Sequence, residues 1–208
     1  MTDVKICGIS NPSHLDCAAK GGARFIGLVF YPPSSRYIDP EQARILARTA
    51  PTGVRTVGLF VNPDNATLDR TVSAVPIDMI QLHGHEDPVR VAEIKSMFHI
   101  PVIKALPVAQ QSDLDGIADY EQVSDWLLFD AKTPQFGGSG QSFDWRILQN
   151  RKFSRPWMLS GGLHAGNIKE ALSTLSPDAV DVSSGVESAP GIKDCSKISE
   201  FLQAVRQA

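Results

Sequence analysis

The sequence lacks the features that would tie it to a membrane, a nucleic acid or an export route. No run of about 18 apolar residues occurs, so we expect no membrane-spanning segment. The first residues have no long apolar stretch before a small-residue cleavage site, which argues against a signal peptide. The 20 Lys and Arg are scattered and outnumbered by 23 Asp and Glu, so we expect no basic face for nucleic acid or anionic lipid.

Cysteine is also scarce. The three cysteines, Cys7, Cys17 and Cys195, are an odd number at irregular spacing, which does not fit a disulfide framework. We therefore expect free thiols and a cytoplasmic location. Cys17 lies beside apolar residues of a predicted helix and is expected to pack there, and Cys195 is given no role.

Eight short apolar runs are the main positive feature. The runs are continuous rather than alternating, which is typical of parallel strands covered on both faces. They span residues 4–7, 25–30, 55–61, 79–82, 102–105, 126–129, 157–159 and 179–182.

Helical patterns separate these runs. They span residues 13–20, 40–49, 64–73, 88–97, 114–120 (weakly), 144–149 (briefly), 165–173 and 194–206. Four of them begin at a capping side chain next to proline, which tolerates the first helical turn. These starts are Asn11-Pro12, Asp39-Pro40, Asn62-Pro63-Asp64 and Asp87-Pro88.

Strand–helix alternation with short links predicts βαβ units and a parallel sheet. An open doubly wound sheet would use five or six strands, and eight units without a dominant early Gly-x-Gly-x-x-Gly favour closure. We therefore predict an α/β fold, a single (β/α)8 TIM barrel that spans residues 1–208 as one domain. Its length is near the lower limit of roughly 200 residues for this fold, so its loops must be short.

Chemistry in such a barrel comes from the C-terminal ends of the strands. Cys7 ends the first run, where it is either a small buried hydrophobe or a nucleophile or base whose pKa a nearby positive charge lowers. Asp130 ends the sixth run, where partial burial would favour the protonated form that a general acid needs. Arg36 follows the second run and could bind a carboxylate bidentately.

Glycine and serine follow the last two runs, which is where barrels commonly bind phosphate. Gly161 and Gly162 follow the seventh run, and Ser184 and Gly185 follow the eighth. Glycine there bares backbone N–H groups and lets a phosphate approach. The loop that contains Gly138, Ser139 and Gly140 is either a connector or a flap over the ligand.

Other polar residues near strand ends allow several interpretations. His83 and His85 form a His-x-His pair, but no further histidine falls at a predicted strand end, so we expect no metal site. Gln81 and His83 could orient a substrate. Lys104 is a charge in the barrel mouth or a buried stem, and Asp181 could hold a neighbouring group in place.

The order and spacing of several short motifs resemble those of the phosphoribosylanthranilate isomerase family of tryptophan biosynthesis over essentially the whole chain. The matching segments are Lys5-Ile-Cys-Gly-Ile9, Ser35-Arg-Tyr37, Gln81-Leu-His-Gly84, Phe136-Gly-Gly-Ser-Gly140 with Phe143-Asp-Trp145, Leu159-Ser-Gly-Gly-Leu163 with Asn167, and Asp181-Val-Ser-Ser-Gly-Val-Glu187 with Gly191-Ile-Lys-Asp194. Ser35 and Ser139 depart from the family's usual proline and threonine, which concerns loop rigidity and local packing.

The resemblance implies a barrel that performs a cofactor-free Amadori rearrangement of N-(5-phosphoribosyl)anthranilate. Cys7 then matches the general base, Asp130 the general acid and Arg36 the residue that meets the anthranilate carboxylate. The segments around Gly162 and Ser184-Gly185, with the 138–140 loop, match the phosphate-binding elements. The expected partner is a phosphosugar substrate, and the family includes monomers and homodimers.

Two alternatives remain at this point. A related phosphosugar enzyme is one: an indole-glycerol-phosphate synthase would want several rim lysines, of which only Lys104 is a candidate, and a ribulose-phosphate epimerase would want paired rim aspartates and metal-suitable histidines. A non-catalytic phosphosugar-binding barrel is the other, but binding alone needs neither Cys7 nor Asp130.

Overall fold

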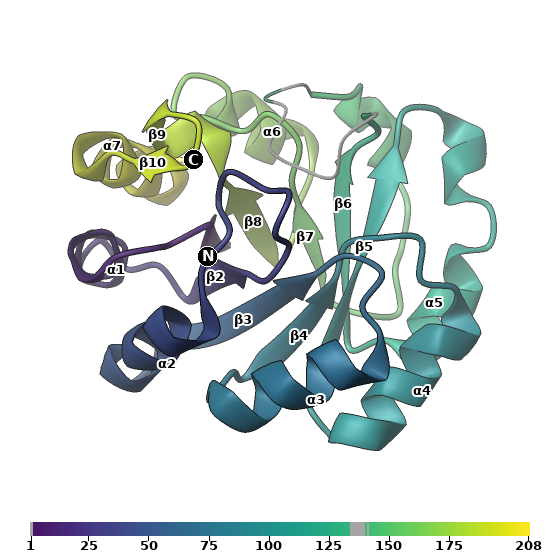
Figure 1. Ribbon diagram of the computed structural model, residues 1–208. Helices are drawn as coiled ribbons and strands as arrows, with labels where there is room; N and C mark the ends of the chain where they lie inside the picture. The colour runs from purple at the N-terminus through teal and green to yellow at the C-terminus, as the bar shows by residue number, and fades with distance from the viewer. Residues whose placement is uncertain (1, 134–139, 141) are drawn as a thin grey trace.

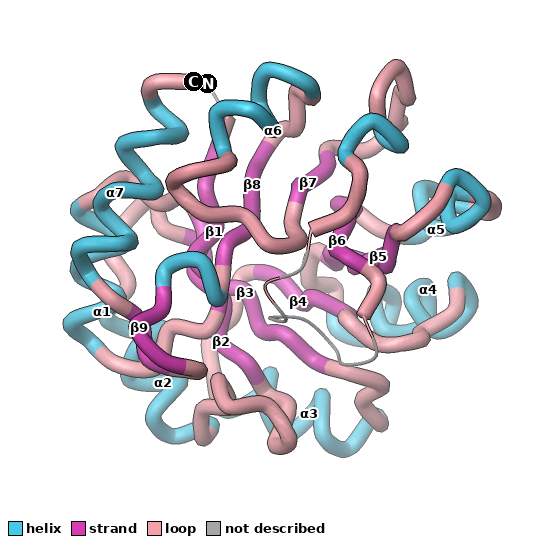
Figure 2. The backbone as a smooth tube through the Cα atoms, turned by 90° about the horizontal axis from the view of Figure 1, so that it is seen from above, coloured by secondary structure: helices cyan, strands magenta, loops and turns pink. Residues whose placement is uncertain are grey.

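The computed structural model describes residues 2–133, 140 and 142–208. Within these residues, eight parallel strands pair in chain order and close into a barrel (Figures 1 and 2). The strands are β1 (Asp3–Cys7), β2 (Phe25–Val29), β3 (Arg55–Phe60), β4 (Met79–Leu82), β5 (Val102–Val108), β6 (Trp126–Ala131), β7 (Trp157–Leu159) and β8 (Ala179–Val182). The predicted (β/α)8 barrel is confirmed.

Helices surround the barrel, as the view from above shows (Figure 2). They are α1 (Pro12–Lys20), α2 (Pro40–Thr49), α3 (Asn65–Ala74), α4 (Pro88–Phe98), α5 (Ile117–Val123), α6 (Ile168–Thr174) and α7 (Cys195–Arg206). Short 3-10 helices are η1 (Gln111–Leu114), η2 (Trp145–Leu148) and η3 (Ser184–Val186), and a hairpin is formed by β9 (Glu187–Ala189) and β10 (Ile192–Lys193). In the described part of the chain, no helix has the length and apolar character that a membrane span needs.

The alternation of side chains along each strand divides the core into two layers. One set of alternate residues fills the barrel interior, and it includes Phe25, Val57, Met79, Ile103, Leu128 and Met158. The other set packs outward against the helices in a larger cluster that includes Ile6, Leu28, Ile80 and Phe201. Because strands such as β2 are buried along their whole length, their sequences read as unbroken apolar runs.

The helix starts agree with the sequence at three of four positions. Asn11, Asp39 and Asp87 each cap a helix by accepting a hydrogen bond from a backbone N–H of its first turn. At the fourth start the cap is Asp64, whose carboxylate accepts from the Thr67 N–H at 2.7 Å. Asn62 does not cap that helix, because its side chain accepts from the His85 N–H at 2.7 Å.

Three connections differ from the prediction. The weak helix expected at 114–120 is split into η1 and α5 by Gly116, whose φ of 79° lies in the left-handed region. The short helix expected at 144–149 is the 3-10 turn η2. The β9–β10 hairpin was not predicted, since strands of three and two residues carry no readable periodicity.

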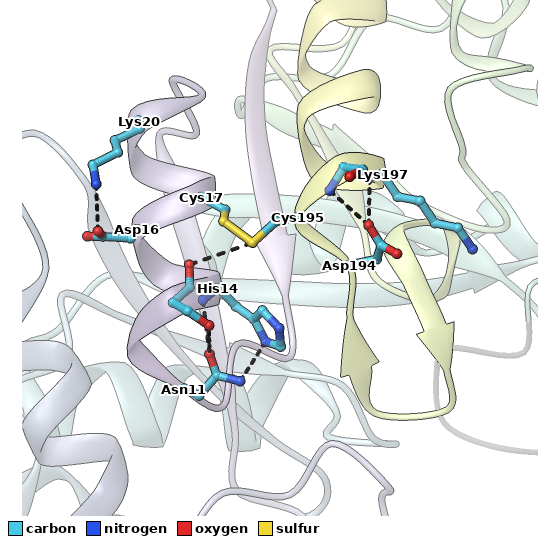
Figure 3. Close-up of a disulfide and its surroundings, with 10 residues drawn as sticks. Asn11, His14, Asp16, Cys17, Lys20, Asp194, Cys195 and Lys197 are labelled. Carbon is cyan, nitrogen blue, oxygen red and sulfur yellow. Dashed lines mark hydrogen bonds and ion pairs between the residues drawn. A yellow bond between two sulfur atoms is a disulfide. The ribbon is translucent and has the colours of Figure 1, made fainter.

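The expectation that all three thiols are free is wrong. Cys17 of α1 and Cys195 of α7 form a disulfide across 178 residues of sequence, and Cys7 is the remaining free cysteine (Figure 3). Pairing of β1 with β8 closes the barrel and brings α1 beside α7 (Figures 1 and 2). Spacing along the chain did not indicate this bond because closure, and not local sequence, brings the two sulfurs together.

Candidate functional site

A pocket opens at the C-terminal ends of the strands, inside the barrel mouth. Its lining includes Cys7, Arg36, His83, Asp130, Asp181 and Ser183. The structure thus brings five of the residues singled out from the sequence into one cavity: Cys7, Arg36, His83, Asp130 and Asp181.

Cys7 ends β1 and is only 5% exposed. It fits there because β2 has glycine opposite it: a Cβ on Gly27 would lie 2.8 Å from the Cys7 sulfur. Burial raises the pKa of the Cys7 thiol, while the Lys5 and Lys193 ammonium groups oppose this effect. We expected a lowered pKa for Cys7 as a base, and this is wrong. Desolvation of the thiolate outweighs the two cations.

Asp130 is oriented by a backbone hydrogen bond and by a contact with His83. Its Oδ1 accepts from the Ala131 N–H at 2.9 Å, and its Oδ2 lies 3.2 Å from Nε2 of His83. The other ring nitrogen of His83 lies 2.9 Å from the amide nitrogen of Gln81, which carries only donors. In the tautomer in which Nδ1 accepts from this amide, Nε2 carries the proton and faces Asp130. Gln81 is fully buried inside the barrel, so it acts on the pocket through His83.

Arg36 is held in place by Glu187, which lies near the other end of the sequence. Its guanidinium forms a bidentate ion pair with Glu187 of β9, with both N–O distances at 2.8 Å. Glu187 also binds the Lys193 ammonium of β10 at 2.6 Å. Burial would raise the pKa of Glu187, but Arg36 and Lys193 together hold it below its ordinary value.

Lys5 lies directly below Cys7 on the same face of β1. Its side chain is completely buried, and its ammonium is 2.9 Å from the Asp181 carboxylate of β8. Lys5, Gly27, Glu187 and Lys193 were not singled out from the sequence as site residues. Only the alternation of β1, which puts residues 5 and 7 on one face, could have indicated one of them.

The glycine-rich rim segments approach one another. A Cβ on Gly185 would collide with the carbonyl oxygen of Leu163, so the loops after β7 and β8 touch there. A Cβ on Gly140 would lie 3.8 Å from the Ser184 hydroxyl oxygen, which places Gly140 beside the same rim. Gly161 and Gly162 have φ values of 89° and 62°, a backbone shape that suits glycine. Gly138 and Ser139 lie outside the described residues.

Lys104 is not among the residues that line this pocket. Lys104 is a buried stem: it binds Glu86 at 2.7 Å and the carbonyl oxygens of Leu82 and Gly84. Among residues 2–133, 140 and 142–208, no group of three or more His, Cys, Asp or Glu side chains could hold a metal ion.

This arrangement is that of a β/α-barrel enzyme, since reactive groups converge at the strand ends where such barrels carry their active sites. The family model for N-(5'phosphoribosyl)anthranilate (PRA) isomerase matches residues 4–204. The chain therefore belongs to the PRA isomerase family.

Individual relatives agree. The chain is 54% identical over 204 residues to the N-(5'-phosphoribosyl)anthranilate isomerase of Rhodospirillum centenum, with 96% of this chain and 95% of the relative covered. A crystal structure of the isomerase from Thermotoga maritima has 40% identity and a TM-score of 0.92, with 100% of both chains covered. A PRA isomerase bound to reduced 1-(o-carboxyphenylamino)-1-deoxyribulose 5-phosphate has 36% identity and a TM-score of 0.87, also over 100% of both chains.

Proposed function

We propose that this chain catalyses the Amadori rearrangement of N-(5'-phosphoribosyl)anthranilate to 1-(2-carboxyphenylamino)-1-deoxyribulose 5-phosphate, a step of tryptophan biosynthesis. The observation that carries the proposal is that Cys7 and Asp130 line one pocket at the barrel mouth. Membership of the PRA isomerase family supports the choice of reaction.

In this proposal Asp130 is the general acid. It donates its proton to the furanose ring oxygen as the C1′–O bond breaks, which leaves an open-chain iminium. His83, itself oriented by Gln81, keeps the carboxyl group facing the pocket. A positioned acid of this kind contributes roughly 10²–10⁴ in rate.

Cys7 is the general base. As a thiolate it removes the proton from C2′ of the iminium, and the resulting enolamine tautomerises to the ketone. The proton that Asp130 gives and the proton that Cys7 takes balance, so exchange with solvent returns the enzyme to its starting state.

The two anionic ends of the substrate would fix the sugar between these groups. Arg36, aligned by Glu187, is the proposed partner of the anthranilate carboxylate. Backbone groups at Gly161, Gly162, Ser184 and Gly185, with the loop that includes Gly138, Ser139 and Gly140, are the proposed phosphate site.

Steady-state kinetics on Cys7→Ala and Asp130→Asn test these roles. Turnover is monitored as the loss of PRA fluorescence. Each variant should lose roughly 10²-fold or more in kcat. Its affinity for inorganic phosphate, measured as competitive inhibition in the residual activity or by calorimetry, should be unchanged. Near-normal turnover in either variant would remove that residue from its role.

Three further statements belong to the proposal. Residues 1–208 act as one domain, because pairing of β1 with β8 ties the two ends of the described chain into one barrel. The enzyme is a monomer or a homodimer; a dimeric PRA isomerase is known from Thermotoga maritima. The cytoplasmic location stays a prediction, and the disulfide removes the argument for it that rested on unpaired cysteines.

A further inference from the structure

The ion pair between Lys5 and Asp181 is buried inside the barrel. The Lys5 side chain is 0% exposed and that of Asp181 is 6% exposed, and 2.9 Å separates the ammonium from the nearer carboxylate oxygen. Such a pair is costly to bury, and apolar residues of similar volume would often serve stability as well or better. Its position directly beneath the proposed base suggests a role in chemistry.

The geometry of β1 directs Lys5 at Cys7. Residues two apart on a strand share a face, so both side chains point into the barrel. The ammonium has three donors, of which one is used by Asp181. Lys5 lowers the pKa of the Cys7 thiol by its charge and by a side-chain hydrogen bond, and Cys7 raises the pKa of Lys5 in the same two ways.

Asp181 keeps the ammonium charged and in place. Burial alone would lower the pKa of Lys5, but the attraction of Asp181 and Cys7 raises it above its ordinary value. The second carboxylate oxygen of Asp181 accepts from the Ser160 hydroxyl at 3.4 Å. The raised pKa favours the protonated form of Lys5, which makes it a hydrogen-bond donor and not the base.

We propose that Lys5, anchored by Asp181, is a positioning residue that stabilises the Cys7 thiolate by donating a hydrogen bond to the sulfur when its proton leaves. The inference rests on the proposed function, in which Cys7 is the base.

Other charged groups also influence the pKa of the Cys7 thiol. Asp181 opposes the thiolate, and Lys193 of β10 favours it. Lys193 is bound to Glu187 and to the carbonyl oxygen of Ser183, so its charge is largely committed there. Across the pocket lie Arg36 from the β2–α2 loop, His83 after β4 and Asp130 of β6. Of these groups, only Lys5 lowers the pKa of Cys7 both by its charge and by a hydrogen bond.

The barrel contains a matched control. Lys104 of β5 is 2% exposed and forms a 2.7 Å ion pair with Glu86, so it resembles Lys5 in burial and pairing. Lys104 is not among the groups that shift the pKa of Cys7 most, which are Lys5, Asp181 and Lys193. Lys5→Met and Lys104→Met each remove a buried ammonium and leave a buried carboxylate without its ion-pair partner, and only the first removes the proposed donor.

The test is a titration of Cys7 in the disulfide-bonded enzyme without substrate. Cys7 is the free cysteine there, so the ultraviolet absorbance of the thiolate reports on it. Lys5→Met should shift the titration midpoint upward by at least about one pH unit, which is a tenfold lower thiolate fraction at a given pH. Lys104→Met should leave the midpoint where it is, and an equal midpoint in both variants would overturn the proposal.

A second variant covers the case in which Lys5→Met does not fold. Replacing both partners, as Lys5→Met with Asp181→Leu, leaves no unpaired buried charge. It should also shift the midpoint upward, although less, because the opposing carboxylate is lost too. An unchanged or lowered midpoint in this variant counts against Lys5.

Kinetics separate this inference from the proposed function. The acid limb of the kcat/KM profile should move upward with the titration midpoint in Lys5→Met, which a purely structural defect would not do. If Cys7→Ala retains turnover, the proposed function fails while the titration result stands. If Cys7→Ala is inactive and Lys5→Met titrates normally, the function stands and the role of Lys5 fails.

Discussion

Arg36 and Glu187 form a bidentate ion pair, with Nε–Oε1 and Nη2–Oε2 distances of 2.8 Å, although 151 residues separate them in sequence. The pair fixes the plane of the guanidinium at the edge of the pocket before any substrate arrives. Glu187 is itself held by Lys193, so the β9–β10 hairpin serves as a brace for a residue of the β2–α2 loop.

Loss of this brace should weaken substrate binding. Glu187→Gln removes the charge that aligns Arg36, so we expect KM for phosphoribosylanthranilate to rise roughly 10- to 100-fold, with kcat changed only a few-fold. Glu93→Gln is the control, because it breaks an exposed ion pair with Arg90 on α4. An unchanged KM in folded Glu187→Gln would show that Arg36 needs no alignment.

The same carboxylate should make stability depend on acid pH. Because the pKa of Glu187 in the folded chain lies below its ordinary value of 4.5, its contribution is fully present above that value. It is lost as the pH falls through the lower folded value. At neutral pH Glu187→Gln should reduce the free energy of unfolding by on the order of 2 kcal/mol. Urea titrations should show this difference narrowing as the pH falls below 4, and a constant difference would contradict the assignment.

Gly27 should be essential to the position of the base. A Cβ there would lie 2.8 Å from the Cys7 sulfur and 3.1 Å from its Cα, so Gly27→Ala must displace both. We expect kcat to fall roughly 100-fold, with a smaller effect on KM. Gly58→Ala is a matched control, since its Cβ would meet Ile77 Cδ1 at the same 2.8 Å. Equal kcat values for the two variants would exclude the displacement of Cys7 as the cause.

The rim contact at Gly185 should matter for phosphate. Gly185→Ala drives a Cβ against the Leu163 carbonyl, so the loops after β7 and β8 must separate. We expect inorganic phosphate to inhibit at least about tenfold more weakly, the loss of one charge-assisted contact. Gly166→Ala on the neighbouring loop is the comparison, because its Cβ would meet only the side chain of His164, which can rotate. Equal phosphate inhibition in the two variants would place the anion elsewhere.

The disulfide should stabilise the closed barrel without affecting turnover. Replacing Cys17 and Cys195 by serine should cost about 2–4 kcal/mol and lower Tm by roughly 4–16 °C, because the bond closes a long loop in the unfolded chain. Reductant should lower the Tm of the wild type and leave the double variant unchanged. Full activity is expected in the variant, since Cys7 is not part of the bond.

Local pattern sufficed for the fold and for two proposed catalytic groups. Continuous apolar runs and capped helix starts marked eight β/α units, because strand burial and helix capping depend on neighbours within a few residues. The same logic placed Cys7 and Asp130 at strand ends, and therefore on one face of the barrel.

Closure of the barrel decided what surrounds those groups. The ion pairs Lys5–Asp181 and Arg36–Glu187 and the disulfide Cys17–Cys195 each join residues more than 150 positions apart. Each depends on the register of β1 against β8 and on the elements that follow β8, which no local periodicity encodes. The chain alone therefore determined which reactive side chains reach the barrel mouth. The tertiary structure decided which charges face them, because partners from opposite ends of the sequence meet only when the barrel closes.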